Sequence, residues 1–212
     1  MKKIILSLVL ILGLNIQAQT PLTQAVNFTE TDLYGNTIDL FSILDEGKWV
    51  IINFGAYWCS PCQSIASDFG QAFEEFGCNT GDIVFIEVEA SAQDDESLCW
   101  DFVNTYGGGH DVPYLCGASN VNNMYEIGAF PTNILINPEG EIVLQDIWPV
   151  DYGLYVLALE GYGIEPQNCN TTNIEENIIN EKNNIIFDIF GRQHATQPKG
   201  LSIKNNQLSY KF

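Results

Sequence analysis

The stretch "VIINFGAYWCSPCQ", from Val50 to Gln63, decides the fold of this 212-residue chain. It begins with an apolar run, which is typical of a strand covered on both faces of a sheet. Two cysteines, Cys59 and Cys62, follow with a Cys-x-x-Cys spacing. Apolar residues then recur at helical spacing until a glycine ends the pattern: Ile65, Phe69, Ala72, Phe73, Phe76 and Gly77. The sequence therefore places two thiols between a buried strand and the first turn of a helix.

The remaining apolar patterns alternate between strands and helices. A Gly-Asn pair between short apolar stretches predicts a small hairpin over 31–40. Acids ahead of a run that ends in three glycines predict a helix over 94–109. A strand is predicted over 82–90, a hairpin over 132–147 and a last helix over 151–163. This order of elements predicts an α/β sandwich around a mixed sheet.

The predicted position of the thiols favours redox chemistry. A helix N-terminus carries unpaired backbone N–H groups and the positive end of the dipole, so it stabilises a thiolate, the reactive form of cysteine. We expect Cys59 to be the exposed nucleophile and Cys62, one turn into the helix, to be the resolving thiol. Pro61 costs little in the first turn because no N–H is needed there. Together with Ser60 it tunes the stability of the reduced form.

Two other uses of a Cys-x-x-Cys pair stay open at this point. Half of a zinc site has the same spacing. However, the other cysteines are singly spaced, and His110 and His194 lie far apart without ligand spacing. The pair also suits a purely structural disulfide. Thiol chemistry needs neither a metal nor an organic cofactor, and we expect none.

The N-terminus has the three parts of a secretory signal peptide. Lys2 and Lys3 precede an apolar run from Ile4 to about Ile16, and the small residue Ala18 follows at a suitable cleavage point. The run is short for a bilayer span, and an N-terminal membrane anchor is the alternative. We predict a signal peptide over 1–18 and an extracytoplasmic protein, in the periplasm, at the cell surface or secreted, where disulfides persist.

Charge is distributed unevenly along the chain. Between Gln19 and Glu181 one basic residue, Lys48, stands against 26 acidic residues. Nucleic acid and anionic lipid are therefore poor partners. The C-terminal end reverses this sign, and a polar run over 166–184 is typical of a linker. The predicted organisation is a signal peptide, a domain over 19–165, this linker and a C-terminal segment over 185–212.

The sequence "NFGAYWCSPC", which includes Trp58, resembles the active-site stretch of thioredoxin-like proteins. It is similar in particular to extracytoplasmic thiol–disulfide oxidoreductases of the TlpA/ResA type. The resemblance runs from Val26 to Gly163 and implies a thioredoxin fold, a mixed central sheet flanked by helices. It includes "GAFPTNILINPEGEIV", which matches the family's cis-proline strand, so a cis Pro131 is implied. Such a bond leaves no N–H beside the sulfurs and exposes the backbone around Phe130 for a substrate strand.

The chain departs from this family where a base is expected. Thioredoxins carry a buried aspartate on the strand before the thiols, and the matching residue here is Asn53, which takes no proton. Some ResA-type members have a glutamate three residues past the second cysteine, where this chain has Ile65. Glu87 or Glu89 on the neighbouring strand is the candidate base for Cys62. The alternative is that both are solvated carboxylates at the end of a strand.

The resemblance also implies how the four remaining cysteines pair in an oxidising compartment. In the thioredoxin fold, the helix after the thiols and the final helix run the same way on one sheet face. Cys78 and Cys169 would then both follow helix ends at the pole opposite Cys59. Cys99 lies in the next helix and Cys116 in the segment after it. The implied bridges are Cys78–Cys169 and Cys99–Cys116, and the alternative is that some of these thiols are free.

A second resemblance concerns the C-terminus. The stretches "NNIIFDIFGRQ" and "PKGLSIKNNQLSYKF" resemble the C-terminal sorting domain of the type IX secretion route. The matching residues are Phe187, Asp188, Gly191, Arg192, Lys199 and Gly200. The intervening strands are shorter than in that domain, and Ser202 replaces an aromatic residue. The implied partner is the secretion machinery, and the alternative is a small β-appendage without a role in export.

The expected function is a secreted thiol–disulfide oxidoreductase that exchanges dithiol and disulfide with protein substrates. Cys59 attacks a substrate disulfide, Cys62 resolves the mixed disulfide, and a separate redox partner recycles the pair. The main alternative is a redox-inert binding module with a static Cys59–Cys62 bridge. A peroxidase of this fold requires an arginine beside a lone cysteine, and Arg192, near the C-terminus, is the one arginine of the chain. Copper delivery requires a wider cysteine spacing. Both functions are therefore disfavoured. Reductase, oxidase and isomerase share this architecture, so the direction of exchange stays open.

Overall fold

The computed structural model describes residues 19–91, 95–148 and 150–169, together with the backbone of four short C-terminal strands. The chain divides into two compact units, Met1–Asn170 and Thr171–Phe212. The predicted signal peptide over 1–18 lies outside the described residues, as does the predicted linker from residue 170 to residue 184. The predicted elements from the first hairpin to the last helix all belong to the N-terminal unit.

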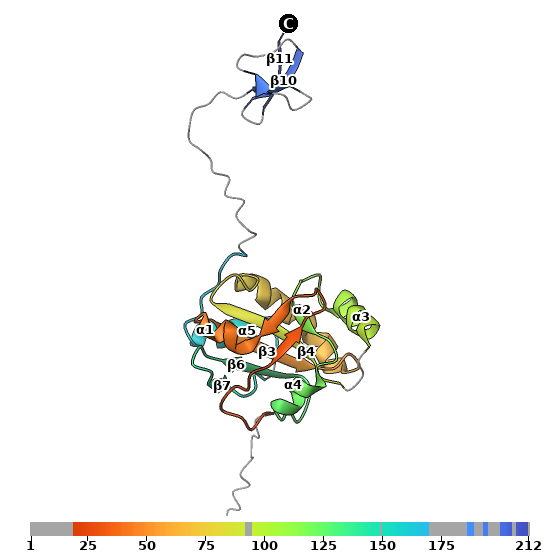
Figure 1. Cartoon of the computed structure of the whole chain (residues 1–212), viewed down its shortest axis with the longest axis vertical. Helices are drawn as coiled ribbons and strands as arrows, with labels where there is room; N and C mark the ends of the chain where they lie inside the picture. The colour runs from red at the N-terminus through yellow and green to blue at the C-terminus, as the bar shows by residue number, and fades with distance from the viewer. Residues whose placement is uncertain are drawn as a thin grey trace, which may run out of the picture. The chain divides into compact units, whose positions relative to one another are not determined.

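A five-stranded mixed sheet forms the centre of the N-terminal unit (Figure 1). Its strands lie in the order β5-β4-β3-β6-β7, and the middle strand β3 runs parallel to β4 and antiparallel to β6. The five strands are β3 (Trp49–Gly55), β4 (Ile83–Glu89), β5 (Tyr114–Leu115), β6 (Thr132–Ile136) and β7 (Ile142–Leu144). This mixed sheet, flanked by helices, confirms the thioredoxin fold expected from the sequence.

Helices cover both faces of this sheet. The helices α2 (Ser60–Glu75) and α5 (Tyr152–Gly161) pack on one face, and α1 (Leu40–Asp45) and α4 (Ser119–Met124) pack on the other. Successive side chains of a strand point to opposite faces. Accordingly Ile51 of β3 packs with α2 and α5, whereas its neighbours on either side pack with α1 and α4. Residues 50–54 are all buried for this reason, which explains the apolar run in the sequence.

The first hairpin and the third helix complete the N-terminal unit. The expected hairpin forms from β1 (Thr29–Thr31) and β2 (Thr37–Asp39), with Gly35 in its turn at a φ of +86° that favours glycine. The helix α3 (Glu96–Tyr106) packs against α2 through its buried Phe102 and Cys99. Aspartates cap α1, α3 and α5, since their carboxylates accept a backbone N–H in the first turn: Asp39, Asp95 and Asp151.

Three short elements were not predicted from the sequence. They are α1, α4 and the two-residue strand β5. Helices of six residues do not form on their own in water, and they depend on tertiary packing instead. Their buried residues Leu40, Leu44 and Val121 provide that packing. No helix in the described ranges is both long enough and apolar enough to span a bilayer.

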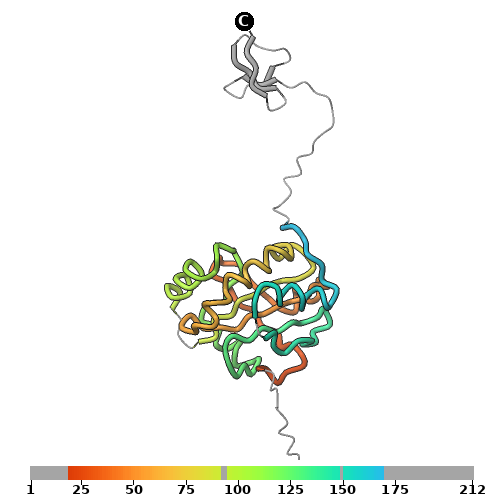
Figure 2. Tube along the Cα trace, turned by 180° about the vertical axis from the view of Figure 1, so that it is seen from behind, coloured from red at the N-terminus to blue at the C-terminus, as the bar shows by residue number. Residues whose placement is uncertain are grey.

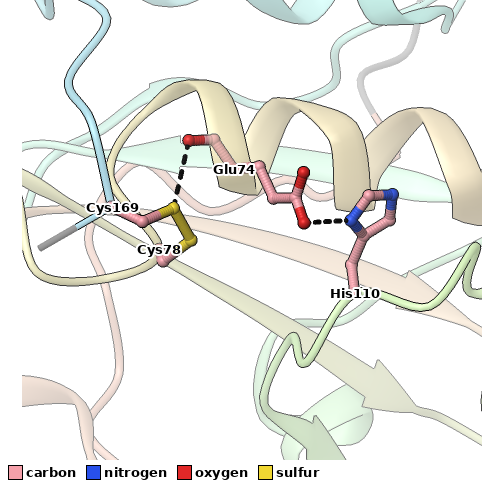
Figure 3. A network of polar contacts seen from close by, with 4 residues as sticks. All are labelled: Glu74, Cys78, His110 and Cys169. Atoms are coloured by element: carbon pink, nitrogen blue, oxygen red, sulfur yellow. Dashed lines mark hydrogen bonds and ion pairs between the residues drawn. A yellow bond between two sulfur atoms is a disulfide. The ribbon is translucent and has the colours of Figure 1, made fainter. Parts of the chain in front are cut away.

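The end of the N-terminal unit returns to the end of α2. Gln167 pairs with Phe76 in an isolated parallel bridge. A disulfide joins Cys78 to Cys169, with their Cα atoms 5.0 Å apart, and Figure 3 shows this bridge beside the last turn of α2. In Figure 2 the segment that follows α5, coloured blue, runs alongside this part of the unit. Because α2 begins next to Cys59, this disulfide lies at the opposite pole from the thiol pair.

In the C-terminal unit the structure describes four short strands. They are β8 (Ile186–Asp188), β9 (Gln193–His194), β10 (Gly200–Lys204) and β11 (Gln207–Lys211). They form an antiparallel sheet in the order β11-β10-β8-β9. This sheet gives the chain a small C-terminal β-appendage, and it does not by itself distinguish a sorting segment from an appendage without a role in export.

The two structural disulfides are expected to differ in their contributions to stability. Replacing Cys78 and Cys169 by serine together is expected to lower the free energy of unfolding by about 4–5 kcal/mol, because this bridge spans 91 residues. The same change at Cys99 and Cys116, which are 17 residues apart, is expected to cost about 3 kcal/mol. Urea unfolding of both double variants, with the Cys59–Cys62 pair oxidised, measures the difference. A larger loss for the shorter loop would contradict the loop-length argument.

Candidate active site

Cys59 and Cys62 lie where β3 ends and α2 begins. Cys59 is the N-cap residue of α2, and the backbone N–H of Cys62 points at its sulfur, with 3.2 Å between N and Sγ. The two residues form a disulfide, with their Cα atoms 5.2 Å apart. Pro61 occupies the first turn of α2, as expected. Gly55 lies against Cys62, since a Cβ atom at that position would be in van der Waals contact with its sulfur, at 3.4 Å.

The two sulfurs differ in their access to partners. Both residues are buried, contrary to the expectation that Cys59 is exposed: Cys59 is 6% exposed and Cys62 is 1% exposed, because helix α2 and the segment that leads into β6 close around the pair. Of the two, Cys59 alone lines a hollow of about 510 Å³ on the surface. The walls of this hollow are formed by Trp58, Cys59, Ser60, Pro61, Ile127, Gly128, Ala129 and Phe130. An incoming sulfur therefore meets Cys59, while Cys62 is shielded behind it.

The second wall of the hollow leads into β6. The peptide bond between Phe130 and Pro131 is cis. The Phe130 ring packs edge-on against Trp58, with 6.2 Å between the ring centroids, and Trp58 is 60% exposed. The pairing of β6 with β3 starts at Thr132. The backbone of Phe130 thus lies outside this ladder, beside an open aromatic rim.

The N-terminal segment holds this second wall in place. The backbone N–H of Gly128 donates to the carbonyl of Gln19 at 2.9 Å. The side-chain amide of Gln19 donates to the carbonyl of Pro131 at 3.4 Å and to the carboxylate of Asp146 at 2.9 Å. Burial raises the pKa of Asp146. Sequence reasoning missed Gln19 and Asp146, because the Gln19 contacts bridge 112 and 127 positions and neither residue lies in a motif.

Glu87 is a buried carboxyl group in the middle of the sheet. It lies opposite Asn53 in the pairing of β4 with β3, and the Asn53 side-chain amide donates to it at 3.1 Å. Burial raises the pKa of Glu87 to about 7, the charge of Glu89 adds to the rise, and the hydrogen bond from Asn53 opposes it. A carboxyl group that titrates near neutral pH is suited to accepting and returning a proton.

Glu89 is also buried, and it braces the loop that carries the thiols. Its carboxylate accepts hydrogen bonds from the backbone N–H of Tyr57 at 2.7 Å, from the hydroxyl of Tyr114 at 3.1 Å and from the backbone N–H of Ser91 at 3.0 Å. The alternative that Glu87 and Glu89 are solvated carboxylates at a strand end is therefore wrong. All of β4 is buried, because helices cover both faces of the sheet and β5 extends it beyond β4.

A row of polar side chains crosses the sheet beneath α2 and α5. Asn133 of β6 lies opposite Asn53, and the hydroxyl of Tyr155 donates to Asn133 at 2.9 Å. Among the described residues, Asn53 Oδ1 and Asn133 Nδ2 are a buried acceptor and a buried donor without a protein partner, which gives them the capacity to bind a water molecule. Sequence reasoning missed Asn133 and Tyr155. A polar residue inside the apolar run "TNILI" was the signal for Asn133.

The second structural disulfide lies beside the same loop. It joins Cys99 of α3 to Cys116, which follows β5, with their Cα atoms 6.0 Å apart. Cys99 belongs to a buried cluster with Ala66 of α2 and with Tyr114, and Tyr57 packs against this cluster. The bridge therefore holds α3 and β5 next to the segment that positions Cys59.

The candidate metal ligands do not gather at one place. Within residues 19–91, 95–148 and 150–169, no three His, Cys, Asp or Glu side chains lie together in a way that could hold a metal ion. His110 instead pairs with Glu74 of α2, with 2.8 Å between Nδ1 and Oε1. His194 belongs to β9 in the other unit.

Known proteins share this sequence pattern. A model of the AhpC/TSA family matches residues 21–145. The chain is 35% identical over 120 residues to the thiol-disulfide oxidoreductase ResA of Halalkalibacterium halodurans, covering 57% of this chain and 64% of the relative. It is 30% identical over 124 residues to ResA of Bacillus thuringiensis, covering 58% of this chain and 68% of the relative. The chain thus spans about two thirds of the length of these relatives.

A solved structure agrees with the fold. The thioredoxin domain of a thiol-disulfide oxidoreductase from Bacteroides vulgatus matches with a TM-score of 0.53 and 22% identity, over 66% of this chain and 95% of that one. The AhpC/TSA match covers more than half of the 212 residues and includes Cys59, Cys62 and Pro131. The chain therefore belongs to the AhpC/TSA family, among its ResA-like thiol–disulfide oxidoreductases.

Proposed function

We propose that the protein is a secreted thiol–disulfide oxidoreductase that exchanges dithiol and disulfide with protein substrates through Cys59 and Cys62. The observation that carries this proposal is the placement of the pair. Cys59 caps the helix and lines the hollow, while Cys62 lies behind it. A static bridge in a binding module needs no such access to one of its two sulfurs. Membership of the family supports the same reaction class.

The first step takes place in the reduced protein. The Cys59 thiolate attacks one sulfur of a substrate disulfide, a mixed disulfide forms, and the other substrate sulfur leaves as a thiolate. The N-terminus of α2 stabilises the negative charge on Cys59. The backbone N–H of Cys62, 3.2 Å from the Cys59 sulfur, contributes to the same effect. These two interactions make Cys59 the nucleophile.

The second step resolves the mixed disulfide. The Cys62 thiolate attacks the sulfur of Cys59, and the remaining substrate sulfur leaves as a thiolate. Two electrons have then passed from the protein to the substrate. In the opposite direction, a substrate thiolate attacks Cys59 of the oxidised pair and Cys62 leaves. The reduction potentials of the two couples set which direction dominates, and a separate redox partner restores the starting state.

Glu87 is the base that we assign to Cys62. Asn53 and Gly55 lie two residues apart on the same face of β3, which is about 6–7 Å along a strand. Gly55 lies under Cys62, and Glu87 is bonded to Asn53. Over this separation the proton passes through a bridging water molecule. The raised pKa of Glu87, about 7, suits this role, whereas Glu89 braces the loop.

The hollow suits an extended polypeptide substrate. The backbone of Phe130 lies outside the β3–β6 ladder, so it is placed to pair with a substrate strand next to Cys59. Pro131 brings no N–H that would compete for the sulfurs. The rings of Trp58 and Phe130 offer apolar surface to the residues that flank the substrate cysteine.

The two ends of the chain set its location in this proposal. A signal peptide over 1–18 directs export, and residues 185–212 act as a sorting segment that contacts the secretion machinery. Two observations support an extracytoplasmic location. All six cysteines are paired in disulfides, which fits an oxidising compartment. The C-terminal strands form a separate compact unit, where a sorting segment is expected.

Substitutions of the two thiols are expected to have different effects. Cys59→Ser should abolish exchange. Cys62→Ser should accumulate a mixed disulfide, because Cys59 still attacks the substrate and no thiol resolves the product. Intact-mass spectrometry after mixing each protein with a disulfide peptide measures the adduct.

The matched control for these thiols lies at the opposite pole. The double serine variant of Cys78 and Cys169 is expected to exchange at the wild-type rate. Normal turnover by the Cys62→Ser protein would contradict the two-thiol mechanism. If dithiothreitol left the Cys59–Cys62 bond intact in the folded protein, the pair would be a static bridge instead.

Glu87→Gln is expected to change how stability depends on pH. The pKa of Glu87 is raised from 4.5 to about 7, so the unfolded chain releases this proton first and stability is lost as pH rises between these values. At about pH 8 the variant should be more stable than the wild type by about 3 kcal/mol, while at about pH 4 the two should be alike. Urea unfolding of the oxidised proteins measures both. A difference that does not vary with pH would refute the raised pKa.

The same variant tests the role of Glu87 as a base. Glu87→Gln should slow resolution by Cys62 about 10²–10⁴-fold and remove the titration of this rate near pH 7. The control is Glu89→Gln, which should disturb the loop and, by removing a charge that raises the pKa of Glu87, move that titration to lower pH without abolishing it. An unchanged pH profile in Glu87→Gln would rule out this base.

Deleting residues 171–212 tests the sorting segment. In a Gram-negative host with a type IX secretion route, the truncated protein is expected to stay in the periplasm while the full chain reaches the cell surface or the medium. Cell fractionation followed by immunoblotting measures the distribution. The same distribution for both proteins would show that the C-terminal unit has no role in export.

A further inference from the structure

The N-terminal unit carries a one-sided charge. From Gln19 to Cys169 the sequence contains 23 aspartate and glutamate residues, with Lys48 as the single lysine and no arginine. His110 is the single histidine in this stretch. Such a charge creates a negative electrostatic potential over the surface that every partner must approach. Concave sites focus this potential.

The lysine and the histidine of this stretch both lie against glutamates. Lys48 Nζ lies 3.1 Å from Glu46, immediately before β3. His110 lies against Glu74 of α2, as Figure 3 shows. The seven residues of β3, about 23 Å, separate Lys48 from the end of the strand that leads to Cys59. That is more than two Debye lengths at physiological salt, about 8 Å each. Lys48 therefore does not offset the carboxylates around the thiols.

Two carboxylates are also connected to the wall of the hollow, one along the chain and one through hydrogen bonds. Glu126 is exposed and immediately precedes Ile127 in the wall. Asp146 is bonded to Gln19, whose amide also reaches the carbonyl of Pro131. The lining residues are uncharged, and Trp58 and Phe130 make its rim aromatic. A partner that complements this surface brings an apolar side chain into the hollow and positive charge around it.

We propose that the hollow beside Cys59 selects positively charged polypeptide segments. The preferred exchange partners are then basic proteins whose reactive cysteine is flanked by lysine or arginine and by an apolar residue. This inference rests on the proposed exchange function and names its substrate class. The same field repels acidic proteins and anionic small thiols.

The charge acts on the encounter that precedes the covalent step. Complementary fields raise association rates by about 10–10³-fold, and the gain falls steeply with ionic strength. The covalent step itself is the exchange described above. With a dithiol peptide and the oxidised protein, one peptide thiolate attacks Cys59 and Cys62 leaves as a thiolate. The second peptide thiolate then attacks the peptide sulfur bound to Cys59, and Cys59 leaves as a thiolate. Two electrons and two protons have passed to the protein, and the peptide is oxidised.

The test compares three dithiol peptides that differ in charge alone. Each carries the same cysteine pair and apolar residue, flanked by lysine, glutamine or glutamate. The full oxidised chain is mixed with each peptide, and the change in tryptophan fluorescence, to which Trp58 next to the pair contributes, follows the reaction. At about 0.01 M salt the lysine peptide should react at least about tenfold faster than the glutamate peptide. At about 1 M salt, where the Debye length is about 3 Å, this ratio should collapse. Reaction with the neutral hydroxyethyl disulfide corrects for the intrinsic reactivity of each peptide.

A pair of charge reversals locates the effect. Glu126→Lys changes the carboxylate that directly precedes the wall of the hollow in the sequence, and Glu139→Lys changes one in the β6–β7 turn, at the end of β6 away from Pro131. Both residues are exposed, and both variants change the net charge equally. At low salt Glu126→Lys should slow the lysine peptide about threefold to tenfold relative to Glu139→Lys and should accelerate the glutamate peptide.

The outcomes separate this inference from the proposed function. Equal corrected rates for the three peptides at every salt concentration would overturn the charge selection and leave the exchange function intact. A faster glutamine or glutamate peptide would overturn it as well, as would equal effects of the two charge reversals. No exchange with any peptide would refute the proposed exchange function itself.

Discussion

The burial of β3 on both faces is the constraint on which the rest of this structure depends. Helices on each side remove residues 50–54 from water, so an apolar run is required there. The strand ends at Gly55, and the chain passes within a few residues into α2, which covers one of the two faces. The cysteine pair therefore falls on the rim of the core and at a helix N-terminus. The reactive placement of Cys59 follows from how β3 is packed.

Burying polar groups inside this core costs folding free energy. The two buried glutamates lie on the strand next to the one that leads to the thiols. Hydrogen bonds from Tyr57, Ser91 and Tyr114 compensate the burial of the Glu89 carboxylate, and Glu89 in turn holds the loop that precedes Cys59. Glu87 keeps a raised pKa despite its bond from Asn53, so its ionisation costs stability near neutral pH. Strongly shifted carboxyl groups cluster at functional sites because chemistry there requires a proton to move.

Short-range and long-range electrostatics act on different steps in this protein. The helix terminus and the N–H of Cys62 lie within hydrogen-bond reach of the Cys59 sulfur, so salt screens them little. The acidic surface acts over longer distances and is screened by salt. With Lys48 paired to Glu46 before β3, the thiolate relies on these local groups while the surface charge acts on the approaching partner. In the proposed mechanism, reactivity and partner choice are then controlled by separate parts of the sequence.

The sequence by itself determined the strand, the thiol pair, the helix after it and the proline-bearing strand, because these follow from local periodicity and from short motifs. It left open whether Glu87 and Glu89 are buried or solvated, since their burial depends on β5, α3 and the helices that cover β4. It also missed Gln19 and Asp146, whose contacts join positions far apart in the chain. Short helices such as α1 carry too few residues to show a period. Tertiary structure decided these features, because a pKa and a short helix depend on neighbours that only the fold brings together.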